Sequence, residues 1–346
     1  MKNAERMDEI DIAKAIGILC VLVGHWTDGN IHKYIYLFHM PLFFIISGMF
    51  IEEKDMDGAG ILVKESRLIS SYFVYSVVFI IYDFIRTLSV QSVISNLANT
   101  ITLFGIYTLW FLASLWMAKC ILRLLLNINN RKSLLLIIFL TYTICYCISN
   151  WIVTLKGEGF VFFVFKYLLW SLIRSGVMLV FLYIGFTCKN YIKCMIDTLK
   201  QSNTMSCLVI MVSFFAILPF AQFQHIDYHV LQNGMFVINI FVGVCGFVLV
   251  ISMAAFIAAV SKSVNDFLVF GGRNSIHYMA FEYFGFSTYI KQLIGCVEVP
   301  YSNIWGFVVY YVLASILVFI FYRYINLLID KVKRFNDCLL NRIVVR

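Results

Sequence analysis

The first hydrophobic segment of the chain carries charged and imidazole side chains that could do chemistry. Lys14 and His25 are eleven residues apart. On an α-helix this spacing places them within about 20° of one face and roughly 16 Å apart along the axis. Asp11 lies one turn before Lys14, where the two side chains can form an ion pair. Because an imidazole exchanges protons near neutral pH, His25 is a candidate general base.

A second hydrophobic run follows after a short turn and brings His39 to a depth similar to that of His25. We expect Pro41 to bend this helix and open room for a ligand. Ser47 and Gly48 are small enough to let a neighbouring helix or a substrate approach closely. If the rotations of the two helices agree, both imidazoles face a common cavity.

These polar residues also have simpler explanations. A histidine inside a membrane often serves only as a hydrogen-bonding group between helices, and Lys14 with Asp11 could be an ion pair at the membrane interface. Arg174, in the sixth hydrophobic run, lies deep enough to need a carboxylate or a water-lined cavity. Glu282 in the ninth run is an available partner for it.

A short loop sequence places His225, Asp227 and His229 at alternate positions, as metal ligands sometimes are. A fourth ligand and a known ligand spacing are both missing from the pattern. We therefore interpret these residues as the polar lining of an external mouth and expect no metal site.

The composition of the chain indicates that the segments carrying these residues lie in a membrane. The chain is 62% hydrophobic and 13% charged, whereas a soluble domain is nearer half apolar and a quarter charged. About ten hydrophobic runs are long enough to span a bilayer, at residues 9–28, 34–51, 68–86, 103–125, 133–153, 160–187, 206–223, 234–260, 267–290 and 303–328. We therefore expect an all-α fold, a polytopic integral membrane bundle of about ten transmembrane helices. It would form a single domain over residues 1–346, with no appended soluble domain.

The basic residues predict the orientation of this bundle. With the N-terminus inside, most Lys and Arg residues fall in cytoplasmic segments, as the positive-inside rule requires. The segments expected outside hold Lys33, Arg86, Lys156 and Lys291. Both termini are therefore expected to be cytoplasmic. The net charge of +8 then reflects membrane topology, and we expect no nucleic-acid partner.

The polar residues occur in an order that resembles a known family. The opening IDIAKAIGILCVLVGH (residues 10–25) is similar to the start of the acyltransferase-3 membrane family, whose first helix carries an Arg and a His separated by ten residues. Lys14 stands at the Arg position and His25 at the His position. The stretch FHMPLFFIISG (residues 38–48) resembles the fucose 4-O-acetylase-like branch, in which a basic residue at the first position is also accepted. Three further blocks resemble this branch: KESRLISSY (64–72), TLWFLASL (108–115) and GRNSIHYM (272–279).

Two positions depart from the family pattern. Members commonly carry Pro where Ser71 stands, and a His where Phe281 stands. The first departure bears on the geometry of the third helix. The second removes a late polar contact.

The resemblance implies acyl transfer from cytoplasmic acetyl-CoA to a hydroxyl of a surface polysaccharide or of a lipid-linked sugar precursor. The expected enzyme is an acetyl-CoA-dependent O-acetyltransferase in the plasma membrane of a bacterium. Its partners would be acyl-CoA, a carbohydrate or lipid-linked glycan acceptor and the lipid bilayer, without a tightly bound cofactor. The oligomeric state stays open, a homodimer included.

Family and chemistry together suggest roles for the candidate residues. Lys14, beside Asp11, would hold CoA phosphates together with Lys64 and Arg67. His25 would act as general base on a sugar hydroxyl, or would accept the acyl group before passing it on. His39 would orient His25 or bind the sugar, and Asp28 would fix the His25 tautomer if the helix continues that far. Trp110 would be a sugar-stacking or interfacial aromatic residue. The remaining candidates are polar groups that bind substrate or stabilise the structure: Ser47, Arg174 and Glu282.

The competing function is a transporter or flippase without covalent chemistry. In that hypothesis Lys14, Arg174 and Glu282 form a charge relay across the membrane. It predicts inverted internal repeats and broken helices at corresponding positions. Neither feature is evident in the sequence.

Overall fold

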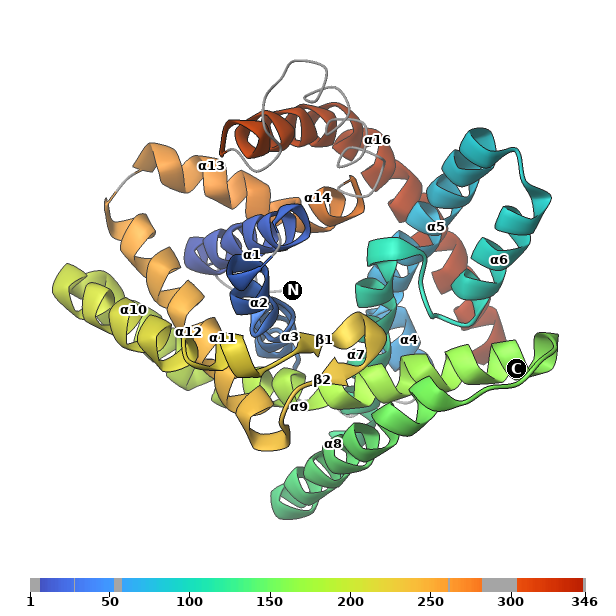
Figure 1. The fold of residues 1–346 in the computed structure, drawn as a ribbon, viewed down its shortest axis with the longest axis horizontal. Coiled ribbons are helices and arrows are strands. Elements are labelled where there is room, and N and C mark those ends of the chain that lie inside the picture. The colour runs from blue at the N-terminus through green and yellow to red at the C-terminus, as the bar shows by residue number, and fades with distance from the viewer. Residues whose placement is uncertain (1–6, 28, 53–57, 261, 282–303, 345–346) are drawn as a thin grey trace. The chain divides into compact units, whose positions relative to one another are not determined.

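A computed structural model of the chain describes residues 7–27, 29–52, 58–260, 262–281 and 304–344. Within them helices form almost the whole structure (Figure 1). The two strands in this part, β1 (Ile226–Asp227) and β2 (Gln232–Asn233), have two residues each. The prediction of an all-α fold is therefore confirmed.

Six helical segments of the described part are long and apolar enough to cross a membrane: Ser66–Thr87, Tyr107–Leu125, Arg131–Thr154, Phe160–Gln201, Asn203–Phe223 and Phe236–Val260. The first helix, α1 (Asp8–Trp26), is not among these six, because its first two turns hold four charged residues. The number of ten spans and the orientation stay predictions.

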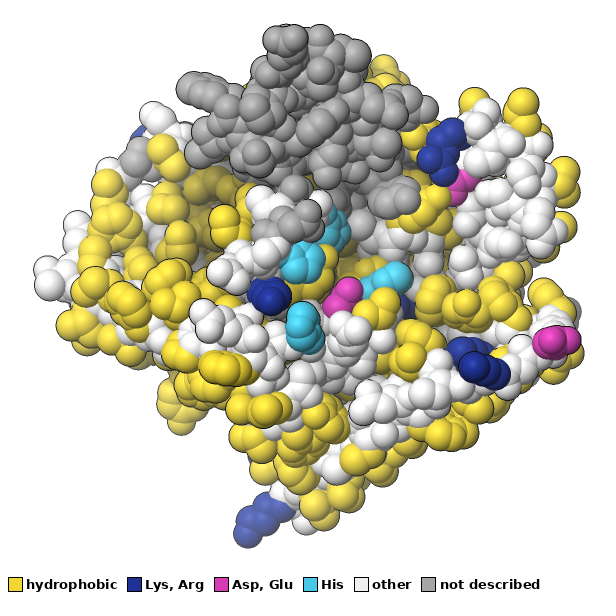
Figure 2. All heavy atoms as spheres, in the orientation of Figure 1, with side chains coloured by type: hydrophobic (Ala, Val, Ile, Leu, Met, Phe, Trp, Pro, Cys, Tyr) yellow, Lys and Arg dark blue, Asp and Glu magenta, His cyan; other side chains and the backbone are white. Residues whose placement is uncertain are grey.

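The outer surface also suits a lipid environment. Large side chains such as Ile85, Phe139 and Val237 are 48–69% exposed, although each lies on a long apolar helix. Hydrophobic side chains are spread widely over the face seen in Figure 2. Exposed apolar surface on this scale marks a membrane or partner contact in a protein.

The chain divides into two compact units. Unit 1 comprises residues 1–50, 184–227 and 233–318, and unit 2 comprises residues 51–183, 228–232 and 319–346. The helices of unit 1, in chain order, are α1, α2 (Asn30–Tyr36), α3 (His39–Met49), the end of α9 (Phe160–Gln201), α10 (Asn203–Ile217), α11 (Phe220–Phe223), α12 (Phe236–Val260), α13 (Lys262–Arg273), α14 (Ser275–Phe281) and the start of α16 (Ile304–Val344).

Helix α1 forms the centre of unit 1. It packs against α3, α12, α13 and α14, and Figure 1 shows it flanked by the α13 and α14 ribbons. Ile10, Ile12, Leu22 and other apolar side chains around its circumference are buried. A helix that is apolar on all sides is one that other elements cover, and this burial fixes the rotation of its polar residues.

Unit 2 contains α4 (Gly58–Lys64), α5 (Ser66–Thr87), α6 (Val90–Ile101), the short 3₁₀ helix η1 (Tyr107–Leu109), α7 (Trp110–Leu125), α8 (Arg131–Thr154), the start of α9, a second 3₁₀ helix η2 (Tyr228–Val230) and the end of α16. Helix α5 packs against α6 and α7. Ser71, where family members commonly carry Pro, lies within α5, and its hydroxyl donates to the Arg67 carbonyl at 2.9 Å. The helix is therefore continuous through this position.

The second hydrophobic run is not one helix bent at Pro41, as the sequence suggested. It is broken earlier, at Leu37 and Phe38, between α2 and α3. Phe38 has φ −139° and ψ −18° and accepts a hydrogen bond from the Leu42 amide. Pro41 then falls in the first turn of α3, where its missing N–H has no helical partner to lose.

Two other expected boundaries are wrong. A break was expected over residues 189–203, but α9 continues as one helix to Gln201. Polar residues alone do not end a helix, and this stretch has neither Gly nor Pro. The ninth hydrophobic run is divided instead: α13 ends at Arg273 and α14 begins at Ser275. Residues 282–303 lie outside the described part.

Candidate active site

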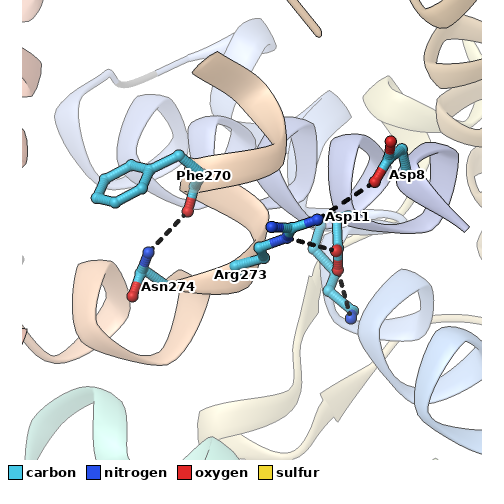
Figure 3. A network of polar contacts seen from close by, with 6 residues as sticks. Asp8, Asp11, Phe270, Arg273 and Asn274 are labelled. Atoms are coloured by element: carbon cyan, nitrogen blue, oxygen red, sulfur yellow. Dashed lines mark hydrogen bonds and ion pairs between the residues drawn. The ribbon is translucent and has the colours of Figure 1, made fainter. Parts of the chain in front are cut away.

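At the N-terminal end of α1, one buried carboxylate joins two cations. Asp11 is 2% exposed, and its Oδ1 lies 3.1 Å from Nζ of Lys14. Its Oδ2 lies 3.4 Å from Nε of Arg273, whose Nη2 lies 3.4 Å from Oδ1 of Asp8 (Figure 3). The expected pairing of Lys14 with Asp11 is therefore present, and Arg273 is a third member that the sequence reasoning missed.

A glycine brings Arg273 to this carboxylate. Gly272 of α13 lies directly against the backbone of Asp11, where an added Cβ would overlap the Asp11 carbonyl oxygen. Only a residue without a side chain permits this contact, so α13 approaches α1 closely enough for Arg273 to reach the carboxylates. Beside it, Nζ of Lys200 lies 2.5 Å from Oε1 of Glu9, which ties the end of α9 to α1.

At the other end of α1, three histidines surround one tyrosine. His25 lies in the last turn of α1 and is exposed. The Tyr36 ring stacks on His32, with ring centroids 3.9 Å apart, and its centroid lies 4.8 Å from that of His39 and 6.2 Å from that of His25. The rings of His25 and His39 therefore both lie near that of Tyr36, and the common cavity expected for them stays a prediction.

Backbone carbonyls determine where the hydrogens sit on two of these rings. Nδ1 of His32 lies 2.7 Å from the Gly24 carbonyl, and Nδ1 of His39 lies 3.0 Å from the Ile35 carbonyl. A carbonyl oxygen only accepts, so each Nδ1 must carry a hydrogen. In the neutral ring Nε2 is then the proton acceptor. His39 is 3% exposed, which suits it to holding the cluster in place, whereas His25 is open to a substrate.

Both clusters belong to unit 1 and are held by one helix. Lys14 and His25 lie roughly 16 Å apart along α1, on nearly the same face. One end offers a cation, the other a proton acceptor. This arrangement can bind an anionic group at one end and activate a hydroxyl at the other.

Unit 2 holds a separate polar group around Arg174 of α9. Arg174 is fully buried, and it donates from Nε to Oγ of Ser114 at 2.8 Å and from Nη2 to the Phe104 carbonyl at 2.9 Å. Its guanidinium carbon lies 4.8 Å above the Trp110 ring and 5.6 Å above the Phe104 ring. The ring of His229 lies beside Trp110, with centroids 5.7 Å apart.

The sequence led us to expect a carboxylate or a water-lined cavity for Arg174. The partners described in unit 2 are a hydroxyl, a carbonyl and two aromatic faces, which hold the guanidinium through hydrogen bonds from Nε and Nη2 and through cation–π contacts. Trp110, expected as a sugar-stacking or interfacial residue, is 9% exposed and serves Arg174. Glu282 lies outside the described residues, so its pairing with Arg174 stays a prediction.

The other predicted residues are placed as follows. Lys64 pairs with Glu52 at 3.5 Å, and Arg67 with Asp330 at 3.7 Å, so each has its own carboxylate in unit 2. Ser47 is half-buried in α3. Asp28 lies outside the described residues, and α1 ends at Trp26, so the helical continuation assumed for Asp28 does not occur. In the described part, no three His, Cys, Asp or Glu side chains lie close enough to hold a metal ion.

Comparison with known proteins identifies the family of the chain. A family model described as an acyltransferase domain matches residues 7–327. The chain belongs to the acyltransferase-3 family. No curated protein and no solved structure matches this acyltransferase significantly, so the branch within the family stays a prediction. The matched region contains both ends of α1 and the groups around Arg174.

Sequence reasoning missed six residues of the two clusters on α1: Asp8, Glu9, His32, Tyr36, Lys200 and Arg273. His32 lies in the segment expected to be a short external turn, and Tyr36 lies in the run expected over 34–51. Both belong to helix α2. Their spacing of four residues would have placed them on one helical face. For Arg273 the available signal was the Gly-Gly pair before it, because adjacent glycines mark close approach of two backbones.

Proposed function

We propose that this acyltransferase is a membrane O-acetyltransferase. It transfers an acetyl group from cytoplasmic acetyl-CoA to a hydroxyl of a surface polysaccharide or of a lipid-linked sugar precursor, in the plasma membrane of a bacterium. Family membership supplies the reaction class. The observation that carries the finer proposal is the pair of clusters on α1, an ion-pair network with a part-exposed Lys14 at its N-terminal end and an imidazole cluster at its C-terminal end.

The N-terminal end of α1 suits the donor. The distribution of Lys and Arg favours a cytoplasmic N-terminus, where acetyl-CoA is available. Lys14 is a compact point charge, and Arg273 beside it supplies a planar fork that matches a phosphate. Lys14 Nζ is part-exposed and already oriented by Asp11, so it can turn towards an incoming phosphate without leaving its counterion. The network thus compensates for a Lys where the family commonly has Arg.

The C-terminal end of α1 suits the transfer step. Nε2 of His25 takes the proton of the acceptor hydroxyl while that oxygen attacks the thioester carbonyl. The carbon–sulfur bond then breaks, the ester remains on the sugar, and the proton passes to the departing CoA thiolate. The second route, in which His25 carries the acetyl group before the sugar oxygen attacks, uses the same residue.

Transport is the weaker hypothesis for this chain. A relay through Lys14, Arg174 and Glu282 would need buried charges placed for handing on an ion. The family found for the chain is one of acyltransferases, and the Arg174 side chain is held by a hydroxyl, a carbonyl and aromatic rings. A static structural role accounts for these contacts better than a relay does.

The test uses the purified full-length chain in detergent with radiolabelled acetyl-CoA and a lipid-linked glycan extract as acceptor. Transfer of label to the glycan fraction should fall by about 100-fold or more in His25→Ala, the scale of lost general base catalysis. His225→Ala is the matched control, because His225 is exposed and lies outside the cluster around Tyr36. Undiminished transfer by His25→Ala would refute the role of His25. Absence of labelled glycan with every acceptor would refute acetyl transfer itself.

A further inference from the structure

Unit 2 contains a buried ionic cluster that the transfer reaction does not use. Glu65, the residue before α5, is 3% exposed and receives two cations from α7. Its Oε2 lies 2.5 Å from Nζ of Lys119, and its Oε1 accepts from Nε of Arg123 at 2.7 Å. Lys119 and Arg123 are four residues apart and therefore lie on one face of α7.

The cluster contains two cations, Lys119 and Arg123, but one carboxylate, Glu65, so one positive charge is not neutralised within it. The neighbouring pairs, Lys64 with Glu52 and Arg67 with Asp330, match one cation to one carboxylate. Here Arg123 is 4% exposed, and its Nη1 has no hydrogen-bond partner among the described residues and no access to solvent. A buried guanidinium nitrogen in this condition is costly and implies a missing acceptor.

The end of α7 accounts for only part of this surplus. Arg123 lies in the last turn of the helix, where the carbonyl ends contribute roughly half a negative charge. That dipole does not place an acceptor atom on Nη1. A tetrahedral oxyanion would do both, since it brings a full negative charge and several acceptor oxygens.

We propose that Lys119 and Arg123 form a binding site for a phosphate monoester or diester. One phosphate oxygen accepts from Nη1 of Arg123, and the charge pairs with Nζ of Lys119. Lys119 is the more open member, with a side chain 20% exposed, and its flexible stem can swing aside to admit the ligand. Glu65 then holds Arg123 in place. The phosphate would come from the nucleotide part of a soluble donor or from the headgroup of an anionic phospholipid.

The proposal concerns binding alone and stands whether or not acetyl transfer is established. The full-length chain is purified in detergent and titrated with adenosine 3′,5′-bisphosphate by calorimetry. In a second arm, phosphatidylglycerol is added and bound lipid is counted by native mass spectrometry. Nucleotide binding that Lys119→Gln weakens points to a soluble donor, lipid binding that it weakens points to a headgroup, and either result supports the site. Binding of neither probe overturns it and leaves an internal ion cluster.

Variants assign the binding to these residues. Lys119→Gln and Arg123→Lys should each weaken the bound probe by about 10- to 100-fold, since a hydrogen bond or pair with a charged group is lost. Lys132→Gln and Lys193→Gln are the matched controls, because both lysines are exposed, neither belongs to the Glu65 cluster, and their loss should change affinity less than about threefold. If Arg123→Lys does not fold, Lys119→Gln alone tests the site, because in that variant Glu65 still pairs with Arg123. Equal weakening by the controls, or unchanged binding by Lys119→Gln, overturns the site.

Discussion

Replacing Gly272 by Ala should separate α13 from α1. An added Cβ would lie 2.5 Å from the carbonyl carbon and 2.9 Å from Cα of Asp11, whereas carbon atoms in contact are about 3.5–4.0 Å apart. The neighbour is backbone, so the helices themselves must move by roughly 1 Å. That movement takes the 3.4 Å contact between Arg273 and Asp11 beyond the ion-pair limit of about 4 Å.

Two measurements should change in Gly272→Ala. The free energy of unfolding should fall by about 1–3 kcal/mol, the range of overpacked cores, seen as a lower melting temperature in detergent. Acetyl transfer per folded molecule should also fall, through a higher KM for acetyl-CoA, because Arg273 no longer supports the donor site. Gly58→Ala is the matched control, since a Cβ there meets nothing within 4 Å. If Gly272→Ala behaves like Gly58→Ala in both measurements, the close packing of these helices does not position Arg273.

Three further predictions test single side chains. Lys14→Gln should raise the KM for acetyl-CoA by about tenfold or more, whereas Lys14→Arg keeps the charge and should stay within about threefold in steady-state kinetics; equal KM values for both variants would remove Lys14 from the donor site. Tyr36→Phe keeps the stacked ring but removes its hydroxyl, and kcat should fall by about tenfold if that hydroxyl takes part in proton transfer; an unchanged kcat limits Tyr36 to packing. Ser114→Ala takes the acceptor from Nε of the buried Arg174 and should lower stability by about 1–3 kcal/mol, measured as a lower melting temperature; an unaltered melting curve would mean that another acceptor replaces it.

The sequence predicts features that depend on local pattern. The first helix was expected over 9–28 and is found at Asp8–Trp26, because hydrophobic length and the acidic first turn are visible in one stretch of residues. The pairing of Lys14 with Asp11 follows in the same way from a spacing of three residues. The break at Leu37 and Phe38 was not predicted, since neither residue is a helix breaker. Packing overrides propensity at this position: Phe38 and Leu37 are both buried.

Contacts between residues far apart in the sequence could not be predicted from local sequence patterns. Arg273 reaches Asp11 across 262 residues of sequence, and Lys200 reaches Glu9 from the far end of α9. Charge counting in one segment cannot reveal such partners, because any of the 27 Lys and Arg residues could have filled the role. The same limit applies to Arg174, for which the sequence suggested a carboxylate or a water-lined cavity and the described residues supply a hydroxyl and a carbonyl. A hydroxyl and a carbonyl leave no charge signal in the sequence, although each accepts a hydrogen bond from the buried guanidinium.

The two ends of α1 are positioned by the same physical device. Gly272 lets α13 bring Arg273 to Asp11, and Gly24 has the corresponding role in the last turn of α1. A Cβ on Gly24 would lie 3.2 Å from the Tyr36 ring and 3.3 Å from Ile35, so its absence lets α2 lie tightly against α1. The Gly24 carbonyl then accepts from His32, whose ring stacks on that of Tyr36. Polar residues give each end its chemistry, but close backbone packing brings them within reach, and this is why a motif of Lys14 and His25 alone is not a complete site.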